Sequence, residues 1–568
     1  MNHIFEAIEG GSDEPEPTRE NNDVDGSLAT ADHCHGYIFG TPCAPAAEED
    51  LPYPLPSQVP FLWRTYVDNV DPFIKILHVP TVEEIITQAK GKLDHQSPSF
   101  QALLFAVCLA AIASLDANEV SDSFRVSKSE LVSCLRLKTE RALGHAQFAT
   151  TKDVVVVQAL TIYLFILPHI GVGELAGNLV GVLVRIATRM GLHRDPLGEP
   201  SRGPVPTALT VETRRRLWWH ILFLDSRGQG LSSPGGGIVS EDSFTTRNPT
   251  NADDQSLAET PAATSNSLDG SHQRLTPATL SVIRCEIWRL RNSLRQTSDQ
   301  PLDLQLHKMH ATRTNIERTY LPSLTPPNAT AFASFLGAIT GLFFAKIEAE
   351  IYRHHLRQTR DDNNHPNSST PTPTTTRSRL LAASVAVIQA TRDLCSPNQP
   401  AWDRWRWHLR GSFPWRAVGS VFIHVCQLPW TPVSERAWEL AHGLLVEPGL
   451  PDASSRGEGA WRRLNELAGD AGVHRRRQME QQQAAEDVRG GGWRGVVQEE
   501  KAGEETMQCV IDAVTGQELN GGDDVQTSLI GTVLAETAAA EWERDVYAMD
   551  EVLGDWLDWD GAADVDMF

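Results

Sequence analysis

Four side chains of this chain have types suited to acid–base chemistry or to metal binding, namely His169, His193, His220 and Asp225. A helical bundle could bring them together, which keeps open an enzyme with a dispersed His/Asp site. A lone histidine on a helix is, however, more often a hydrogen-bonded core residue. The chain has no G-x-S-x-G, no H-E-x-x-H and no phosphate loop. The sequence therefore predicts a protein that is not an enzyme, with no catalytic and no cofactor-binding residue.

A second group of candidate ligands lies near the start of the chain. His33, Cys34, His35 and Cys43 carry imidazole and thiol groups, which zinc prefers. Their spacing matches no compact zinc motif, and they lie in an acidic, polar segment. The eight cysteines of the chain are scattered without any C-x-x-C pair. We therefore expect reduced cysteines and no metal site on this chain.

Cations alternate with aromatic residues at two places. Arg214, Arg215 and Arg216 precede Trp218 and Trp219, and tryptophans and arginines alternate again over 402–410. This combination could contact nucleic acid through phosphates and stacked bases. Three consecutive arginines cover most of a helix circumference, so at least one must face neighbouring helices. The sequence therefore favours ion pairing and stacking inside a helical body.

The elements that carry these residues have helical spacing. From Glu174 onward one apolar stripe contains Leu175, Leu179, Leu183, Ile186 and Met190, and Gly191 is suited to end that helix in the left-handed conformation. A second helix is expected to start at Thr210 as its N-cap and to bury a face with Leu217, Ile221 and Leu224. Signals for strands are nearly absent. The fold is predicted to be all-α, solenoid-like or bundled, with 174–190 packed on 210–225.

Charge and composition divide the 568 residues into segments. Both ends are acidic: residues 1–50 hold twelve acids and one arginine, and 541–568 hold ten acids and one arginine. Residues 1–59 are predicted to be disordered, 60–445 to form one helical domain and 446–540 to be a low-order polar linker. Ser/Thr/Pro-rich insertions are expected near 255–275 and 357–379. The apolar runs 154–167 and 329–345 are interpreted as buried helices, and no membrane partner is expected.

Four segments, in this order, resemble the fungal-specific transcription factor domain of fungal binuclear zinc-cluster regulators. The first is 61–78, with the aromatic opening FLWRTYV. The others are the helix end at 183–195, the central helix at 212–225 and the loop at 248–254. The motif residues are Gly191, Leu192, His193, Arg194, Asp195, Arg214, Arg215, Arg216, Leu217, Trp218, Trp219 and Asp225. The resemblance implies a helical regulatory or dimerisation domain in a nuclear protein, with DNA and a homo- or heterodimer partner.

The chain departs from this family in two places. The Gly-Arg-Pro that usually follows the central helix is here Ser232-Ser233-Pro234. The family's six-cysteine cluster, which holds two zinc ions and reads DNA, has no counterpart, because only Cys34 and Cys43 precede residue 100. DNA contact is therefore expected to be indirect or to need a cluster upstream of Met1. Zinc is expected only with such a cluster.

The acidic C-terminal segment 541–568 is interpreted as a transcriptional activation segment that binds a coactivator. On a helix its large apolar residues form one stripe among the acids, and further aromatic residues follow. The alternative is a helix docked on the protein's own body. The residues concerned are Trp542, Val546, Met549, Leu553, Trp556, Leu557, Trp559 and Phe568.

The sequence thus predicts a transcription regulator of the fungal zinc-cluster type, which controls a metabolic or biosynthetic gene set. It is expected to act in the nucleus through its helical domain and its C-terminal segment. The basic run 474–477 could serve there as a short import signal. Two alternatives remain open at this point: the enzyme with a dispersed site, and an adaptor protein without a link to DNA.

Overall fold

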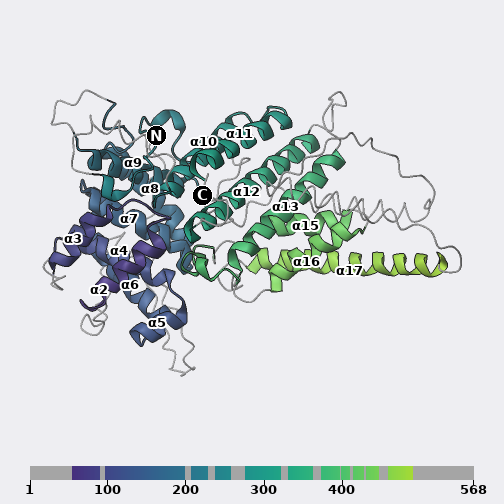
Figure 1. The fold of residues 1–568 in the computed structure, drawn as a ribbon, viewed down its shortest axis with the longest axis horizontal. Coiled ribbons are helices and arrows are strands. Elements are labelled where there is room, and N and C mark those ends of the chain that lie inside the picture. The colour runs from purple at the N-terminus through teal and green to yellow at the C-terminus, as the bar shows by residue number, and fades with distance from the viewer. Residues whose placement is uncertain are drawn as a thin grey trace, which may run out of the picture. The chain divides into compact units, whose positions relative to one another are not determined.

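The computed structural model describes eleven stretches of the chain, and everything below concerns these residues. They are 54–89, 96–198, 206–227, 237–257, 275–321, 330–361, 373–396, 398–409, 413–427, 430–446 and 458–489. Helices and short helical turns make up the regular structure of these stretches, which contain no β-strand (Figure 1). The prediction of an all-α fold is confirmed.

The helices follow one another along the chain from α2 to α17. They are α2 (Val59–Thr65), the π-helical turn η1 (Tyr66–Val70), α3 (Val79–Ala89), α4 (Pro98–Ser114), α5 (Ala117–Phe124), α6 (Lys128–His145), η3 (Phe148–Thr150), α7 (Val154–Ile166), η4 (Leu167–Ile170), α8 (Gly173–Arg189), α9 (Ala208–Asp225), η5 (Glu241–Ser243), η6 (Asp254–Ser256), α10 (Thr279–Gln296), α11 (Leu302–Tyr320), α12 (Ala331–Asp361), α13 (Pro373–Cys395), η8 (Pro400–Trp402), α14 (Asp403–Arg406), α15 (Trp415–Gln427), α16 (Pro432–Val446) and α17 (Glu458–Arg489).

Two helices that are apolar on all sides form the centre of the N-terminal part. α4 begins where Ser97 accepts a hydrogen bond from the backbone N–H of Phe100, with Pro98 in the first turn. It packs against α2, α6 and α7. α7 is buried over almost its whole length, so the run 154–167 is a core helix, as expected.

The motif residues lie on α9 and directly after α8, and these two helices pack against each other, as predicted. On α8, Leu179, Leu183 and Ile186 are buried, whereas Val182 is exposed. α9 differs from the prediction at its start, because Thr207 and not Thr210 is the N-cap. The Thr207 hydroxyl accepts a hydrogen bond from the backbone N–H of Thr210 at 3.1 Å, which places Thr210 inside the first turn. α9 is also buried on nearly all its sides, and not on one face only.

The later helices pack in sequence order. α10 contacts α9, α11 and α12, and α12, α13 and α15 run side by side (Figure 1). Among the described residues, α12 is the single helix that is long and apolar enough to span a membrane. Of its apolar 18-residue window within Ala331–Gln358, 56% is buried in the protein. A core helix has the same properties, which fits the expectation for 329–345.

Two polar segments contain more helix than expected. At the insertion expected near 357–379, α12 continues to Asp361 and α13 begins at Pro373. Leu356 is buried and the Gln358 side chain donates to the carbonyl of Ser298, so packing extends α12 into this polar stretch.

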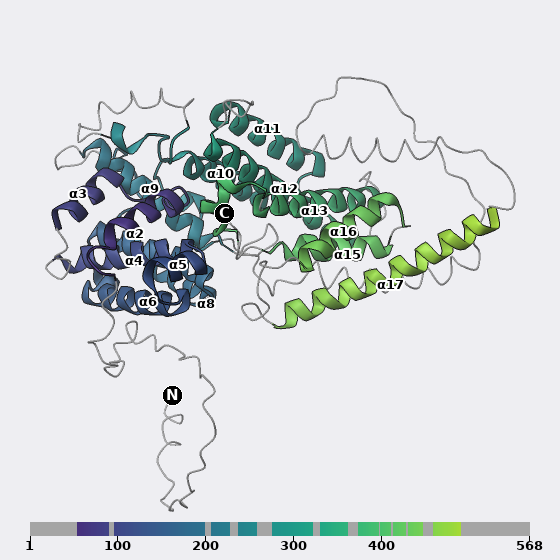
Figure 2. The ribbon, with the colours of Figure 1, turned by 60° about the horizontal axis from the view of Figure 1, so that its bottom comes forward.

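Residues 458–489, expected to be part of a low-order linker, form the long helix α17 beside α15 and α16 (Figure 2). The buried residues Leu464, Leu467 and Ala471 recur every three or four positions and give α17 one narrow apolar stripe. Arg475 adds a paired contact to Glu435 of α16. Polar residues occupy the other sides of α17, so the overall composition of this segment does not reveal the stripe.

Candidate functional site

The first motif feature is the end of α8, which Gly191 terminates with a φ of +70°. The Leu192 N–H donates to the carbonyl of Ala187 at 3.0 Å, and the Gly191 N–H donates to that of Thr188 at 2.9 Å. This pair of bonds closes a helix whose last turn is followed by a left-handed residue. Arg214 of α9 then donates to the carbonyls of Gly191 at 2.9 Å and Met190 at 3.3 Å. A cation thus caps the negative end of the α8 dipole.

The second feature is a two-bond contact between Arg215 and Asp195. The Nε of Arg215 donates to one carboxylate oxygen at 2.8 Å, and its Nη2 donates to the other at 3.0 Å. The same carboxylate accepts from the backbone N–H groups of Arg247 and Leu197. Although burial alone would raise it, the bonds from Arg215 and these N–H groups lower the pKa of Asp195. The carboxylate therefore joins α9 to two loops as an anion.

The third feature is a buried chain of alternating charges, which we call the Arg216 network: Asp71, Lys75, Glu212, Arg216 and Asp254. Arg216 donates to Glu212 at 3.0 Å and to Asp254 at 2.6 Å. Lys75 donates to Asp254 at 2.7 Å and to Asp71 at 2.6 Å. All these side chains are at most 6% exposed.

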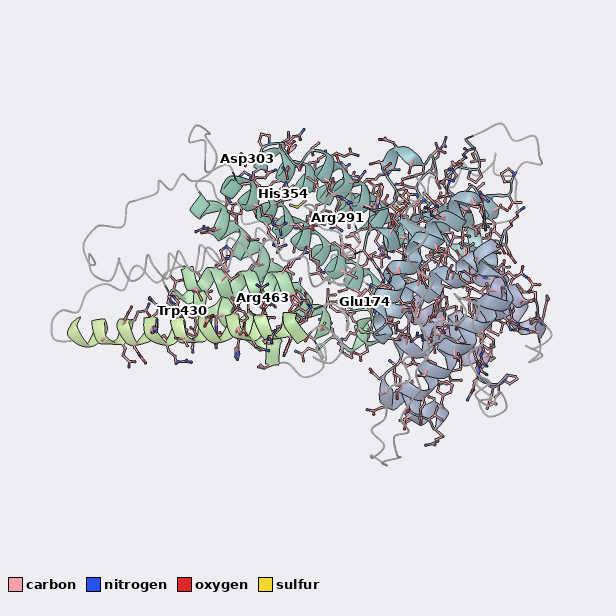
Figure 3. All side chains as sticks on the ribbon, turned by 180° about the vertical axis from the view of Figure 1, so that it is seen from behind. Glu174, Arg291, Asp303, His354, Trp430 and Arg463 are labelled. Carbon is pink, nitrogen blue, oxygen red and sulfur yellow. The ribbon has the colours of Figure 1, made fainter. Side chains whose placement is uncertain are left out.

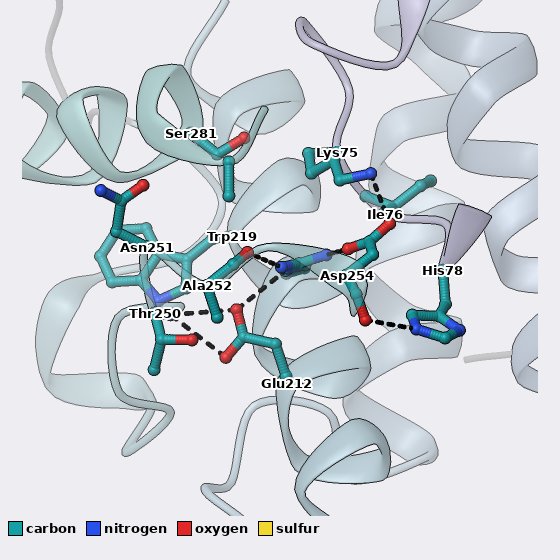
Figure 4. Close-up of polar contacts among 12 residues, drawn as sticks. Lys75, Ile76, His78, Glu212, Trp219, Thr250, Asn251, Ala252, Asp254 and Ser281 are labelled. Atoms are coloured by element: carbon teal, nitrogen blue, oxygen red, sulfur yellow. Dashed lines mark hydrogen bonds and ion pairs between the residues drawn. The ribbon is translucent and has the colours of Figure 1, made fainter. Parts of the chain in front are cut away.

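Backbone groups complete this network (Figure 4). The carboxylate of Glu212 accepts from the N–H of Thr250 at 3.0 and 3.1 Å, and Asp254 accepts from the N–H of Val79 at 3.0 Å. Burial raises the pKa of Asp254, but Lys75 and Arg216 outweigh it and hold the pKa at about 2. The network ties α9 to the segment 71–79 and to the loop 250–254.

The remaining motif residues are packing residues or surface residues. Leu192, Leu217, Trp218 and Trp219 are buried, whereas Arg194 is exposed. The indole N–H of Trp219 donates to the carbonyl of Arg247 at 2.9 Å. Most residues of the motif therefore hold α8, α9 and the loops that follow them in contact with one another.

Asp225 fastens the far end of α9. Its carboxylate accepts hydrogen bonds from the N–H groups of Ile238 at 3.1 Å and Val239 at 3.0 Å. Burial raises the pKa of this carboxyl above its ordinary value. Asp225 thus holds residues 238 and 239 against the end of α9, just as Asp195 holds residue 247 near Arg215 of α9.

The four residues considered for an enzyme site contact different partners. His169 lies against Phe165, Trp407 and His408. The Nδ1 of His220 contacts the carbonyl of Arg216 at 2.8 Å, and its Nε2 lies 3.3 Å from the hydroxyl of Ser281.

His193 faces Trp218, and Asp225 binds backbone N–H groups. The contacts described for these four residues thus lead to different partners. Within the described ranges there is also no cluster of three or more side chains able to hold a metal ion. His33, Cys34, His35, Cys43 and the proposed activation segment lie outside these ranges.

Of the arginines beside tryptophans, Arg215 and Arg216 pair inside the protein, as expected, whereas Arg404 is exposed and Arg410 lies outside the described residues. Arg289 stacks on Trp219 with its guanidinium 5.2 Å from the ring centroid. In the later cluster Trp402, Trp405 and Trp407 are buried. The indole N–H groups of Trp405 and Trp407 donate to the carbonyls of Asp68 and Asn69, each at 3.1 Å. These three tryptophans are therefore part of the core and are not available to stack on bases.

The carboxylates and the lysine of the Arg216 network were not among the predicted site residues. A local signal existed for Lys75, since it stands in the apolar run Phe73-Ile74-Lys75-Ile76-Leu77. A lysine inside such an apolar run is either exposed to solvent or paired with an acid. Its partner Asp254 lies 179 positions away in the chain, and no local pattern could identify it.

Comparison with known proteins agrees with this arrangement. Residues 63–227 match the family model of the fungal specific transcription factor domain. The chain is similar to the aurofusarin cluster transcription factor aurR2 of Gibberella zeae, with 26% identity over 393 residues, covering 67% of this chain and 54% of the relative. It is also 26% identical over 418 residues to the transcriptional regulator AacuB of Aspergillus aculeatus, covering 71% and 53%.

A shorter but closer similarity is to the C6 finger domain transcription factor adaR of Aspergillus niger. The two are 31% identical over 224 residues, which is 39% of this chain and 28% of the relative. The chain thus spans about half the length, or less, of these curated relatives.

Proposed function

We propose that this chain, which carries a fungal specific transcription factor domain at residues 63–227, is a transcription regulator of the zinc-cluster type. It would control a biosynthetic gene set. One observation supports this proposal most strongly: the family model matches the same region in which α8, α9 and their loops are held together by buried hydrogen bonds and ion pairs. Asp195, Arg215 and Arg216, residues of the resemblance, are buried and paired with one another or with the loops. The relatives support the gene set, because one is named for the aurofusarin cluster.

The helical body acts in this proposal as a regulatory and dimerisation domain. It is not proposed to catalyse a reaction, since its histidines are engaged separately in packing and in backbone contacts. The Arg216 network joins α9 to the loop 250–254, and elements joined in this way could transmit a signal from a bound molecule or subunit to other parts of the chain.

DNA is the proposed target, and zinc is proposed to act only through a zinc cluster. That cluster belongs to a dimer partner or to a segment encoded ahead of Met1. The three adjacent arginines of α9 are not proposed to contact DNA, because Arg214, Arg215 and Arg216 point inward to acids and carbonyls. Binding to DNA requires clustered cations that neutralise phosphates.

Transcript profiling of the source fungus tests the proposal. We expect deletion of the gene to lower the transcripts of one co-regulated set, and a tagged protein to accumulate in the nucleus. Loss of no transcript set, together with exclusion from the nucleus, would instead support the adaptor alternative.

The activation segment is proposed to be residues 541–568, and a separate experiment addresses it. Fusion of this segment to an unrelated DNA-binding domain should switch on a reporter gene. Replacement of Trp556, Leu557 and Trp559 by alanine should abolish the signal, whereas a matched triple replacement of the acids Asp555, Asp558 and Asp560 by asparagine should weaken it less. A silent wild-type fusion would refute the assignment.

A further inference from the structure

One side of α8 faces solvent, whereas most of the helix is buried. Its residues lie three or four positions apart and therefore share one helix face, which we call the α8 face: Glu174, Gly177, Asn178, Gly181, Val182 and Arg185. Gly181 is half-buried and the other five residues are exposed. Glu174, labelled in Figure 3, lies in the first turn of α8 and marks one end of this face, and Arg185 marks the other.

Two glycines make a shallow recess in the middle of the α8 face. Apart from the backbone of α8 itself and the chain neighbours, no heavy atom of the described residues lies within 4 Å of the place that a Cβ of Gly177 would take. The fold therefore does not require glycine there, and glycine within an exposed helix is destabilising relative to alanine. The missing side chain does, however, allow another helix to approach closely.

Two apolar side chains are exposed beside this recess. Val182 is 38% exposed and Ile238 is 67% exposed. The Cδ1 of Ile238 lies 3.3 Å from the place that a Cβ of Gly181 would take, so Ile238 borders the α8 face. Asp225 holds this residue by accepting a hydrogen bond from its backbone N–H at 3.1 Å. Apolar surface thus remains in contact with water here, and a partner that covered it would gain stability.

The two ends of the α8 face carry opposite charges. Glu174 and Arg185 are about three helical turns apart, and neither forms an ion pair with another described residue. If two copies of α8 packed in parallel, each charge would face its own counterpart and the like charges would repel. If they packed antiparallel, each charge would face the opposite one. The charges therefore favour the antiparallel arrangement.

We propose that the α8 face binds the α8 face of a second copy of this chain, with the two helices antiparallel. The twofold axis passes through the middle of the face, so residues equally far from it on the two copies meet. Glu174 faces the partner's Arg185, and Val182 fills the recess at the partner's Gly177. The face is thus complementary to itself in charge and in shape. The inference rests on the proposed function, because it assigns a surface to the dimerisation proposed there.

This interface is small. α8 has 17 residues, so it is about 25 Å long. A pair of helices of this length, with Ile238 beside it, buries less than the roughly 800 Å² per partner that is typical of stable complexes. We therefore expect a dissociation constant in the micromolar range. The affinity should fall as salt is added, because the ion pairs lie at the exposed ends of the face.

Sedimentation velocity of the purified full-length chain, from about 1 to 100 µM, tests the recess. The wild type should pass from monomer to dimer over this range. Gly177→Leu should weaken the dimer about ten-fold or more, because the new side chain fills the recess. Its monomer should be at least as stable as the wild type, since leucine favours a helix more than glycine does. The control is Gly469→Leu on α17, which has equally open space and should dimerise like the wild type.

Reversal of charges tests the antiparallel arrangement. Glu174→Arg and Arg185→Glu should each weaken the dimer about ten-fold or more, because both symmetric ion pairs become contacts between like charges. The variant with both changes should regain the affinity of the wild type. An equimolar mixture of the two single variants should form heterodimers. Glu83→Arg, which reverses an exposed acid of α3, should leave the affinity unchanged.

Three results would overturn the proposal. One is a wild type that stays monomeric up to about 100 µM. Another is a dimer that Gly177→Leu leaves intact. The third is a double charge reversal that dimerises as weakly as the single ones. A dimer that survives every change on the α8 face would refute this surface without affecting the proposed function, which transcript profiling tests independently.

Discussion

Two buried arginines on neighbouring helices, Arg216 of α9 and Arg284 of α10, are in opposite electrostatic situations. Arg216 is 2% exposed and pairs with Glu212, Asp254 and the carbonyl of Ala252. Arg284 is 4% exposed and donates to one carbonyl, with no carboxylate partner among the described residues. The comparison separates two uses of the same side chain. A buried cation with its acids beside it stabilises the fold, whereas one without a carboxylate partner keeps the cost of its lost hydration.

The pKa values express the same contrast. Arg216 is fully buried, but Glu212 and Asp254 outweigh the effect of burial and raise its pKa. Arg284 is also fully buried, and without such acids burial lowers its pKa to about 9. The predictions below remove partners from the paired region first, because the loss of one partner leaves the other charge buried.

Asp254→Asn is expected to have the largest effect. It removes the charge that Lys75 and Arg216 share, so both cations remain buried with fewer acids. We expect the free energy of unfolding at pH 7 to fall by about 3–5 kcal/mol, measured by urea denaturation. The exposed Asp242→Asn is the control and should stay within about 0.5 kcal/mol of the wild type. A loss of similar size in both variants would mean that the network contributes little.

Arg215→Lys should have a smaller effect. A lysine keeps the charge near Asp195 but cannot form both bonds of the guanidinium at once. We expect a loss of about 1–3 kcal/mol, again from urea denaturation. A variant as stable as the wild type would show that charge alone, and not the two-bond geometry, holds Asp195.

The buried His220 predicts a stability that depends on pH. Burial, and next Arg284, lower its pKa to about 3 from the ordinary 6.5. Between these values the unfolded chain binds a proton that the folded chain does not. Stability is therefore lost as pH falls below about 6.5, by up to about 1.4 kcal/mol per pH unit.

His220→Gln tests this dependence through the slope of the unfolding free energy between pH 6 and 4.5. The variant should lose part of the slope, and other histidines should maintain more of it, since burial lowers the pKa of His424 to about 4 and that of His408 well below its ordinary value. The exposed His145→Gln should leave the slope unchanged. An unchanged slope in His220→Gln would mean that this ring is protonated in the folded state.

Local patterns predicted the helices that have one strong apolar stripe and clear ends. The stripe of α8 and its end at Gly191 are examples. Local patterns did not predict the helices whose formation depends on long-range packing. One such helix is α17, a polar sequence that a few apolar residues stabilise against α15. The start of α9 was misplaced because Thr207 and Thr210 are both good N-caps, and the choice depends on the preceding backbone.

The site was predicted in part, for a related reason. Three adjacent arginines on a helix imply inward pairing, and the structure confirms it. Glu212 lies one turn before Arg216 on the same helix, but Asp195 and Asp254 come from distant loops and could not be assigned. The arginines Arg284, Arg291 and Arg295 of α10 are visible in the sequence, but the sequence could not show that Arg291 pairs with Glu350 of α12.

The same substitution in the two buried arginines tests the central claim most directly. The free energies of unfolding of Arg216→Met and Arg284→Met should be measured side by side in the full-length chain without added anions. We expect Arg216→Met to lose about 3–5 kcal/mol, because Glu212 and Asp254 lose a shared cation. Arg284→Met should lose less than about 1 kcal/mol or gain stability, because it removes an unpaired buried charge. Losses of equal size would contradict the account, since they would show that Arg284 stabilises the fold as Arg216 does.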